Sequence, residues 1–143
     1  MLSVAGIEQG IVIDHITAGN GLKIVDKLGL GNVDFPVVLL MNVSSEKLGM
    51  KDIIKIENKF ELDLNLLGLI DPNVTINIIK NGEKIEKYKS CIPKQVSGLF
   101  KCTNPRCITN HDIYAEATFT LYDQDKLKYQ CDFCEDFTYF IKE

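Results

Sequence analysis

Two segments near the C-terminus, KCTNPRCITN (101–110) and YQCDFCED (129–136), contain four of the five cysteines in this chain of 143 residues. These cysteines are Cys102, Cys107, Cys131 and Cys134. The C-x4-C and C-x2-C spacings can each turn two thiolates toward one point, and four thiolates close a tetrahedral shell around Zn²⁺ without an open position for water. The spacing therefore predicts one structural zinc ion per chain.

Other uses of these cysteines are less consistent with the sequence. The cysteine count is odd and the first ten residues, MLSVAGIEQG, lack the pattern of a signal peptide, so a disulfide framework is disfavoured. No apolar run approaches the roughly 18 residues of a membrane span, and we expect a cytoplasmic protein with no membrane partner. We expect His111 to be an exposed loop residue and Cys91 to be a buried or linker thiol without chemistry.

The segment around the cysteines is predicted to be a small all-β domain of the zinc-ribbon type, residues 95–143. Alternating apolar and polar residues indicate strands at ATFTLYD (117–123) and LKYQC (127–131), and FTYFI (137–141) supplies an aromatic one. A domain of about fifty residues has a marginal hydrophobic core, so its metal contributes directly to the free energy of folding.

The charge of residues 95–143 bears on what this domain binds. They contain five Lys or Arg against eight Asp or Glu, and zinc with four thiolates adds negative charge, which disfavours a nucleic-acid partner. We expect a protein partner, with the single arginine, Arg106, either an interface anchor or a solvated surface residue. An independent zinc-ribbon module that binds nucleic acid stays as the alternative function.

Residues 1–94 have a different pattern, in which strands and helices alternate. The order is strand, helix, strand, strand, helix, strand, followed by a further strand after the Asn81-Gly82 turn. This order predicts an α+β domain with a ferredoxin-like antiparallel sheet and two helices. The expected strands are 10–16, 35–43, 52–58, 74–80 and 82–90, and the expected helices are 21–30 and 61–70.

One of these strands, MKDIIKIEN (50–58), carries two lysines on one face. Because alternate residues of a strand share a face, Lys51, Ile53 and Lys55 point one way and residues 52, 54 and 56 the other. The lysines would stand about 13 Å apart at a rise of ~3.3 Å per residue, which suits a nucleoside triphosphate. A solvated strand face is the alternative.

Several motifs together resemble the regulatory chain of aspartate carbamoyltransferase. They are GIVIDHI (10–16), GMKDIIKIEN (49–58), PNVTIN (72–77) and the complete set of four cysteines, in the family's order and separations. The resemblance implies a non-catalytic subunit with an effector-binding domain, residues 1–94, that binds CTP or ATP and pairs with a second regulatory chain. It implies further that the zinc domain contacts the catalytic chain, joining two catalytic trimers through three regulatory dimers to control pyrimidine synthesis allosterically.

The resemblance also implies an effector site, residue by residue. Asp14 matches the ribose-side acceptor, His15 and Lys51 phosphate-side groups, Lys55 a ribose- or base-side group, and Lys87 the principal triphosphate lysine. The pocket lining would be Val4, Ile7, Val12 and Ile53, with Asn77 at its border. The partner-interface residues in the first cysteine pair would be Asn104, which is retained, and Arg106, which replaces an asparagine.

The chain departs from the family pattern at two further positions. Met1 stands where the family has a lysine, and Gly82 where an aromatic residue often borders the base. A zinc enzyme that uses Asp14 and His15 is a third interpretation. The closed shell of four thiolates and the absence of the His-x-Glu element of zinc deaminases oppose it.

Overall fold

The structure is a computed structural model that describes residues 6–58 and 61–140. The chain divides into two compact units, Met1–Cys91 and Ile92–Glu143. Each unit contains its own antiparallel sheet, so each has its own hydrophobic core.

The first unit is built on a five-stranded sheet in the order β2-β3-β1-β4-β5, with every neighbouring pair antiparallel. The first four strands have the ferredoxin-like order, and β5 extends the sheet beside β4, which confirms the predicted fold class. The strands are β1 (Gln9–Thr17), β2 (Val37–Ser45), β3 (Gly49–Ile56), β4 (Thr75–Lys80) and β5 (Glu83–Lys89).

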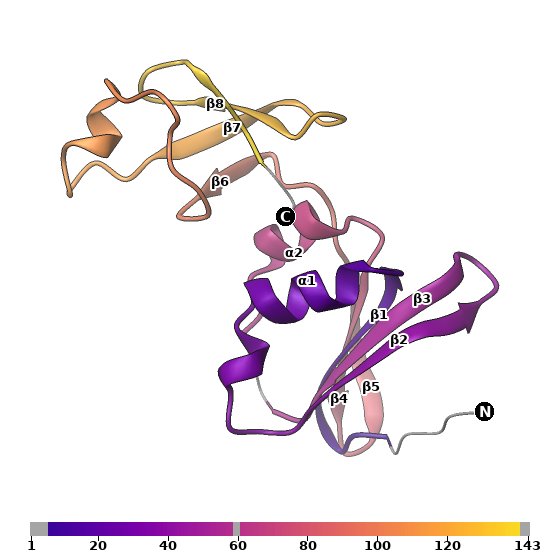
Figure 1. Ribbon diagram of the computed structural model, residues 1–143. Coiled ribbons are helices and arrows are strands. Elements are labelled where there is room, and N and C mark those ends of the chain that lie inside the picture. Colours follow the sequence, from indigo (N-terminus) through magenta and orange to yellow (C-terminus); the bar gives the residue numbers. More distant parts are fainter. Residues whose placement is uncertain (1–5, 59–60, 141–143) are drawn as a thin grey trace. The chain divides into compact units, whose positions relative to one another are not determined.

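Two helices, α1 (Asn20–Lys27) and α2 (Leu64–Ile70), lie on one face of this sheet (Figure 1). Helix α1 ends before Gly29, whose φ of 69° is left-handed, and the short 3₁₀ helix η1 (Leu30–Asn32) follows. Helix α2 starts where the Asp63 side chain accepts the N–H of Leu66 at 3.1 Å. It ends at Ile70 because Asp71, which precedes a proline, is extended.

The core of the first unit lies between the helices and the sheet. On β3, Asp52, Ile54 and Ile56 are fully buried, whereas Lys51, Ile53 and Lys55 are half-buried on the other face, so the predicted alternation is confirmed. The buried cluster consists of Ile11, Ile13, Ile16, Ile24, Leu30, Ile54, Ile56, Leu67, Ile70, Val74 and Ile76. The helices therefore cover one face of the sheet and leave the opposite face without a helical layer.

The turn between β4 and β5 has the conformation that its sequence predicts. Asn81 and Gly82 have φ angles of 53° and 76°, and a two-residue type I′ turn requires positive φ at both central residues. This turn brings β5 back beside β4 as an edge strand in which every residue is exposed.

The second unit has a four-stranded antiparallel sheet in the order β6-β7-β8-β9. Its core contains Phe119 and Tyr129 beneath the ring of Phe100, and the Tyr129 hydroxyl donates to the Pro93 carbonyl at 2.7 Å. Strand β6 is too short to show the alternation that marks a strand, and it was not predicted. The elements are β6 (Gln95–Ser97), η2 (Ile108–Asn110), β7 (Thr118–Asp123), β8 (Lys128–Cys131) and β9 (Phe137–Tyr139).

Across the described parts of the chain, neither helix has the length and apolar character needed to cross a bilayer.

Gly68 on α2 tests the packing of the first unit. A Cβ at this position would overlap the backbone carbonyl oxygen of Cys91, whereas one at Gly31 would meet open space. Alanine normally stabilises a helix by about 1 kcal/mol relative to glycine. We expect Gly68→Ala instead to lower the free energy of unfolding by about 1–3 kcal/mol in urea denaturation, with Gly31→Ala as the control. A Gly68→Ala chain as stable as the unaltered one would contradict this packing.

Candidate functional sites

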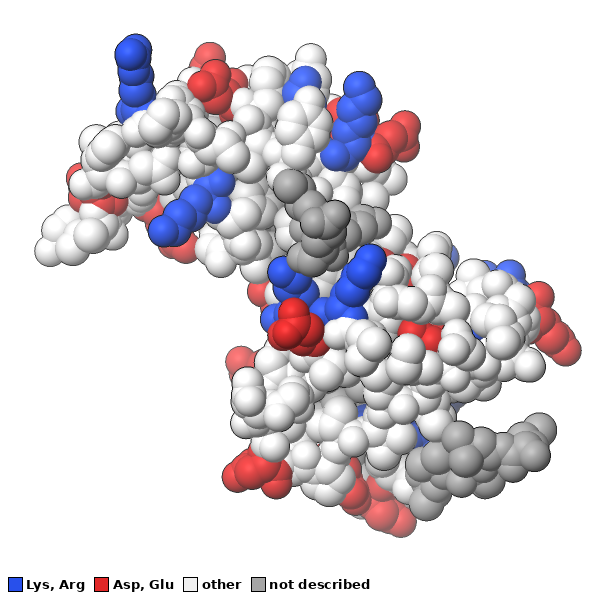
Figure 2. All heavy atoms as spheres, in the orientation of Figure 1, with Lys and Arg blue, Asp and Glu red and all other residues white. Residues whose placement is uncertain are grey.

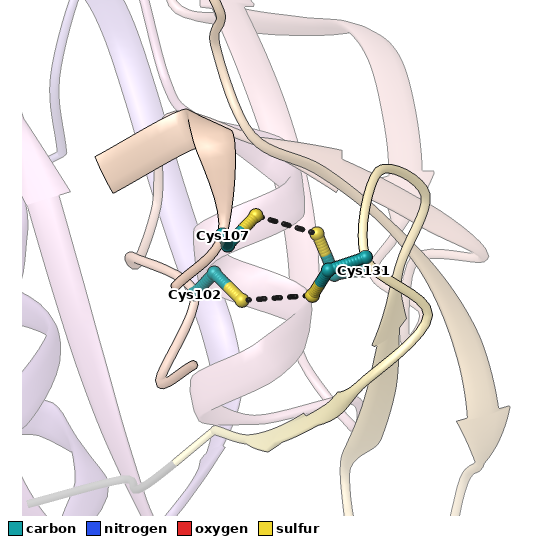
Figure 3. Close-up of side chains that lie close together, drawn as sticks. Cys102, Cys107 and Cys131 are labelled. Atoms are coloured by element: carbon teal, nitrogen blue, oxygen red, sulfur yellow. Dashed lines mark hydrogen bonds between the residues drawn. The ribbon is translucent and has the colours of Figure 1, made fainter. Parts of the chain in front are cut away.

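The four cysteines predicted as metal ligands lie together in the second unit. All four Sγ atoms are within 4.8 Å of one another. The Sγ–Sγ distance is 3.6 Å between Cys102 and Cys134 and 3.8 Å between Cys107 and Cys131. A tetrahedral site with Zn–S bonds of about 2.3 Å has sulfur–sulfur edges of about 3.8 Å, so the cluster fits zinc. Figure 3 shows Cys102 and Cys107 facing Cys131 across the site.

The surroundings of three of the sulfurs change how readily each of these binds a proton. Burial raises the pKa of Cys102 to about 12 and also raises that of Cys131. The hydroxyl of Thr109, 3.1 Å from Cys107 Sγ, lowers the pKa of Cys107 to about 7. Protons therefore compete for these sulfurs at neutral pH, and a soft divalent cation that prefers thiolates can replace them.

The first cysteine pair sits on a loop fixed by its own hydrogen bonds. Asn110 Nδ2 donates to the carbonyls of Cys102 at 3.0 Å and Asn104 at 2.8 Å, and the Asn104 side chain accepts the N–H of Arg106 at 3.0 Å. His111 is exposed, with Nε2 2.6 Å from the Pro105 carbonyl, and it lies outside the cysteine cluster as predicted. These contacts hold the ligand-bearing loop in place before η2.

Four of the predicted effector residues form one row across the sheet of the first unit. Lys55 pairs with Val12, Val12 with Asn77, and Asn77 with Lys87. Residues paired in this way project on the same face, here the face opposite the two helices. Neighbouring strands lie about 4.8 Å apart, so the backbones of Lys55 and Lys87 are separated by about 14 Å. This span suits a nucleotide laid across the strands.

A second group lies beside this row, where β1 is irregular. Lys51 Nζ is 3.0 Å from Asp14 Oδ1, which also accepts the N–H of His15 at 2.6 Å. Burial opposes the charge of Asp14, but the hydrogen bonds and positive charge of Lys51 and His15 outweigh it and hold the pKa of Asp14 below its ordinary value. The strand continues past His15 to Thr17 through a bulge in which His15 has a φ of 57°.

Two buried polar atoms of this region lack a hydrogen-bond partner among the described residues: Asn77 Oδ1 and His15 Nδ1. Only 3% of Asn77 is exposed, although it stands in the middle of the row. A buried polar atom without a partner costs about 1–3 kcal/mol, and such atoms mark a place where a ligand can supply the missing bond. Asn77 and His15 are thus suited to contact a polar ligand.

The remaining residues predicted for the effector site lie in different parts of the first unit or outside the described residues. Ile53 lies on the same face as Lys51 and Lys55, and Ile7 is half-buried just before β1. Val4 lies outside the described residues. Asp52 was missed as a functional candidate, although an acidic residue on the buried face of an apolar strand is itself a signal.

The charged side chains on one face of the second unit are dispersed (Figure 2). On the face drawn in Figure 2, its basic side chains lie apart from one another among acidic and uncharged residues. A nucleic-acid site would instead need a continuous basic surface. The view therefore gives the nucleic-acid alternative no support.

Comparison with known proteins divides the chain close to the boundary between the two compact units. A family model described as aspartate carbamoyltransferase regulatory chain, allosteric domain, matches residues 2–90. A second, described as aspartate carbamoyltransferase regulatory chain, metal binding domain, matches residues 94–141, which include all four clustered cysteines. The second unit therefore binds one structural zinc ion, as predicted.

Similar relatives named aspartate carbamoyltransferase regulatory chain match nearly the whole chain. The Clostridium tetani protein is 47% identical over 144 residues, which cover 100% of both chains. The Clostridium acetobutylicum protein is 46% identical over 95% of this chain and 93% of its own. The Pyrococcus horikoshii protein is 45% identical over 94% of this chain and 90% of its own.

The cysteine cluster yields a prediction about metal content. We expect Cys131→Ser to lose zinc and unfold the second unit, because a domain this small depends on its metal for stability. Cys91→Ser should keep one zinc per chain, since Cys91 is exposed and outside the cluster. Elemental analysis measures both, and zinc release should increase as the pH falls because protons compete for the sulfurs. Equal zinc content in the two variants would rule out Cys131 as a ligand.

Proposed function

This chain belongs to the family of aspartate carbamoyltransferase regulatory chains, and we propose that it binds CTP or ATP on its open sheet face and holds a catalytic chain through its zinc domain. Its relatives are named as regulatory chains, so it is a non-catalytic subunit. Its first unit is an allosteric domain and its second a metal-binding domain. The effectors, their site and the contacts with partner chains are the proposed parts.

The row from Lys55 to Lys87 is the observation that carries the effector proposal. It presents an ammonium group at each end, with Val12 and Asn77 between them. A nucleoside triphosphate has an anionic end, a polar sugar and a flat base. Lys87 matches the anionic end, Asn77 and Asp14 match the sugar, and the apolar side chains match the base. We assign Lys87 to the triphosphate and Lys55 to the sugar or base.

Asp14 and Lys51 have linked roles in this proposal. Lys51 Nζ lies 3.0 Å from Asp14 Oδ1. We assign Lys51 to the phosphate side and the second oxygen of Asp14 to a ribose hydroxyl. The neighbouring His15 Nδ1, which has no partner among the described residues, can bond a phosphate oxygen when the ring is protonated there. Val4, Ile7, Val12 and Ile53 complete the proposed lining.

Lysines suit an effector site that must release its ligand. Each presents a flexible point charge instead of the bidentate grip of arginine, so binding is strong enough to sense a nucleotide yet reversible as its concentration changes. Allosteric control requires the effector to bind the two states of the assembly differently, typically by about 1–3 kcal/mol. A nucleotide bound equally in both states would regulate nothing.

The zinc domain exposes two large apolar side chains in one loop. Ile113 is 90% exposed and Tyr114 91% exposed, in the loop that follows the first cysteine pair. The Tyr114 N–H is held by Asp112 Oδ1 at 2.9 Å. Exposed apolar side chains and arginine are both enriched at protein interfaces, and we assign this loop, with Asn104 and Arg106, to the catalytic chain.

A second regulatory chain would pair along β2. This edge strand carries Val38, Leu40 and Met41, whereas the other edge, β5, is rich in charged residues. Unpaired backbone groups on an apolar edge are the usual place for two sheets to join, and charged edges resist it. We propose a homodimer through β2 in a cytoplasmic assembly, with three such dimers linking two catalytic trimers.

Lys87→Ala tests the effector site. Losing one charge-assisted contact should weaken CTP and ATP binding together by about 1.5–3 kcal/mol, measured by calorimetry on the zinc-loaded chain. Lys23→Ala removes an exposed lysine from α1, on the opposite side of the sheet, and should leave both affinities unchanged. Unchanged affinities in Lys87→Ala would remove this lysine from the site.

Replacing Ile113 and Tyr114 together by serine tests the proposed docking loop. When the chain is expressed with its catalytic chain, the variant should fail to form the large assembly in sedimentation experiments, because its apolar anchors are lost. It should keep its zinc and its nucleotide binding. Tyr122→Ser, which removes an exposed aromatic from β7, is the control. An intact assembly in the double variant would place the interface elsewhere.

A further inference from the structure

Asp52 is a buried carboxylate at the centre of the effector-bearing part of the sheet. It is 0% exposed and lies on β3 between Lys51 and Ile53, pointing to the helical side. Its Oδ2 accepts the backbone N–H of Gly19 at 3.1 Å and of Gly21 at 3.0 Å, and its Oδ1 accepts the N–H of Asn42 at 3.0 Å. A single side chain therefore joins β3 to the start of α1 and to β2.

These bonds occur where both neighbours of β3 are irregular. The β1 register shifts between Ile13 and Ile16, around the left-handed His15, and resumes where Ile16 pairs with Asp52. The β2 register shifts between Leu40 and Val43, around Asn42, whose φ is 61°. Regular ladder bonds are interrupted on both sides of this stretch, and the Asp52 carboxylate supplies acceptors there.

We propose that Asp52 is a positioning residue for effector binding, which rests on the function proposed above. By anchoring β3 to the β2 bulge and to the start of α1, it holds the backbone from which Lys51 reaches Asp14 and the phosphates. Without its three accepted bonds, β3 would no longer be tied to the β2 bulge at Asn42 or to the start of α1, which follows β1 and its bulge at His15. The lysine would keep its charge but lose its fixed direction, and polyphosphate binding depends on that direction.

Gly21 allows the same contact to be disturbed from another element. A Cβ at Gly21 would lie 2.7 Å from Asp52 Oδ2 and 3.0 Å from Asp52 Cβ. Both approaches are too close for a buried side chain, so Gly21→Ala should displace the carboxylate without removing it.

Asp71 provides a matched control within the same unit. It is 1% exposed and accepts three bonds, from the Thr17 N–H at 2.7 Å, Asn20 Nδ2 at 3.2 Å and the Asn73 N–H at 2.9 Å. It anchors the other side of the β1–α1 turn, and its own sequence neighbours take no part in the proposed site. Replacing either aspartate should cost stability, but only Asp52 should affect the ligand.

The experiment is calorimetric titration of the zinc-loaded chain with CTP and with CMP. Asp52→Asn and Gly21→Ala should raise the dissociation constant for CTP about tenfold and reduce the preference for CTP over CMP, because the phosphate-side lysine is misplaced. Asp71→Asn should leave both constants within about twofold of the unaltered chain. Urea denaturation of each variant, done in parallel, identifies conditions in which all are folded.

The outcomes separate the two proposals. Unaltered CTP binding in Asp52→Asn, or equal losses in Asp52→Asn and Asp71→Asn, would overturn the positioning role while leaving the effector site standing. A loss of affinity that is the same for CTP and CMP would also overturn it, since it would reflect general loosening. An unaltered chain that binds no nucleotide would overturn the proposed function and this inference together.

Discussion

The pleat of the β-strand is the constraint on which both units depend. Successive side chains must point to opposite faces, so one sequence has to serve a core and an outer surface at the same time. On β3 the inner set is Asp52, Ile54 and Ile56 and the outer set begins with Lys51. The helices cover the inner set, and the antiparallel register aligns Lys55 with Asn77 and Lys87 in a continuous row on the other face.

The two units are stabilised in different ways. The first buries a large aliphatic cluster between helices and sheet, and this leaves its other face available for a ligand. The second has few core residues, and the four sulfurs from two separate segments of the chain compensate by sharing one metal.

Local patterns predicted the parts that short-range chemistry determines. The spacing of Cys131 and Cys134, the Asn81-Gly82 turn and the alternation on β3 each act within a few residues, and the structure agrees with them. The bulge at His15 could not be predicted, because it arises from pairing with a strand some 35 residues away. The three bonds accepted by Asp52 likewise exist only after β2, β3 and α1 have come together.

The central claim is that the open face of the first sheet is the effector site. Backbone amide chemical shifts of the zinc-loaded chain, recorded as CTP is added, test it most directly. The account predicts saturable shifts on β1, β3, β4 and β5 around Val12, Lys55, Asn77 and Lys87, with the amides of the second unit unchanged. Shifts confined to the second unit, or to the outer surfaces of α1 and α2, would contradict it.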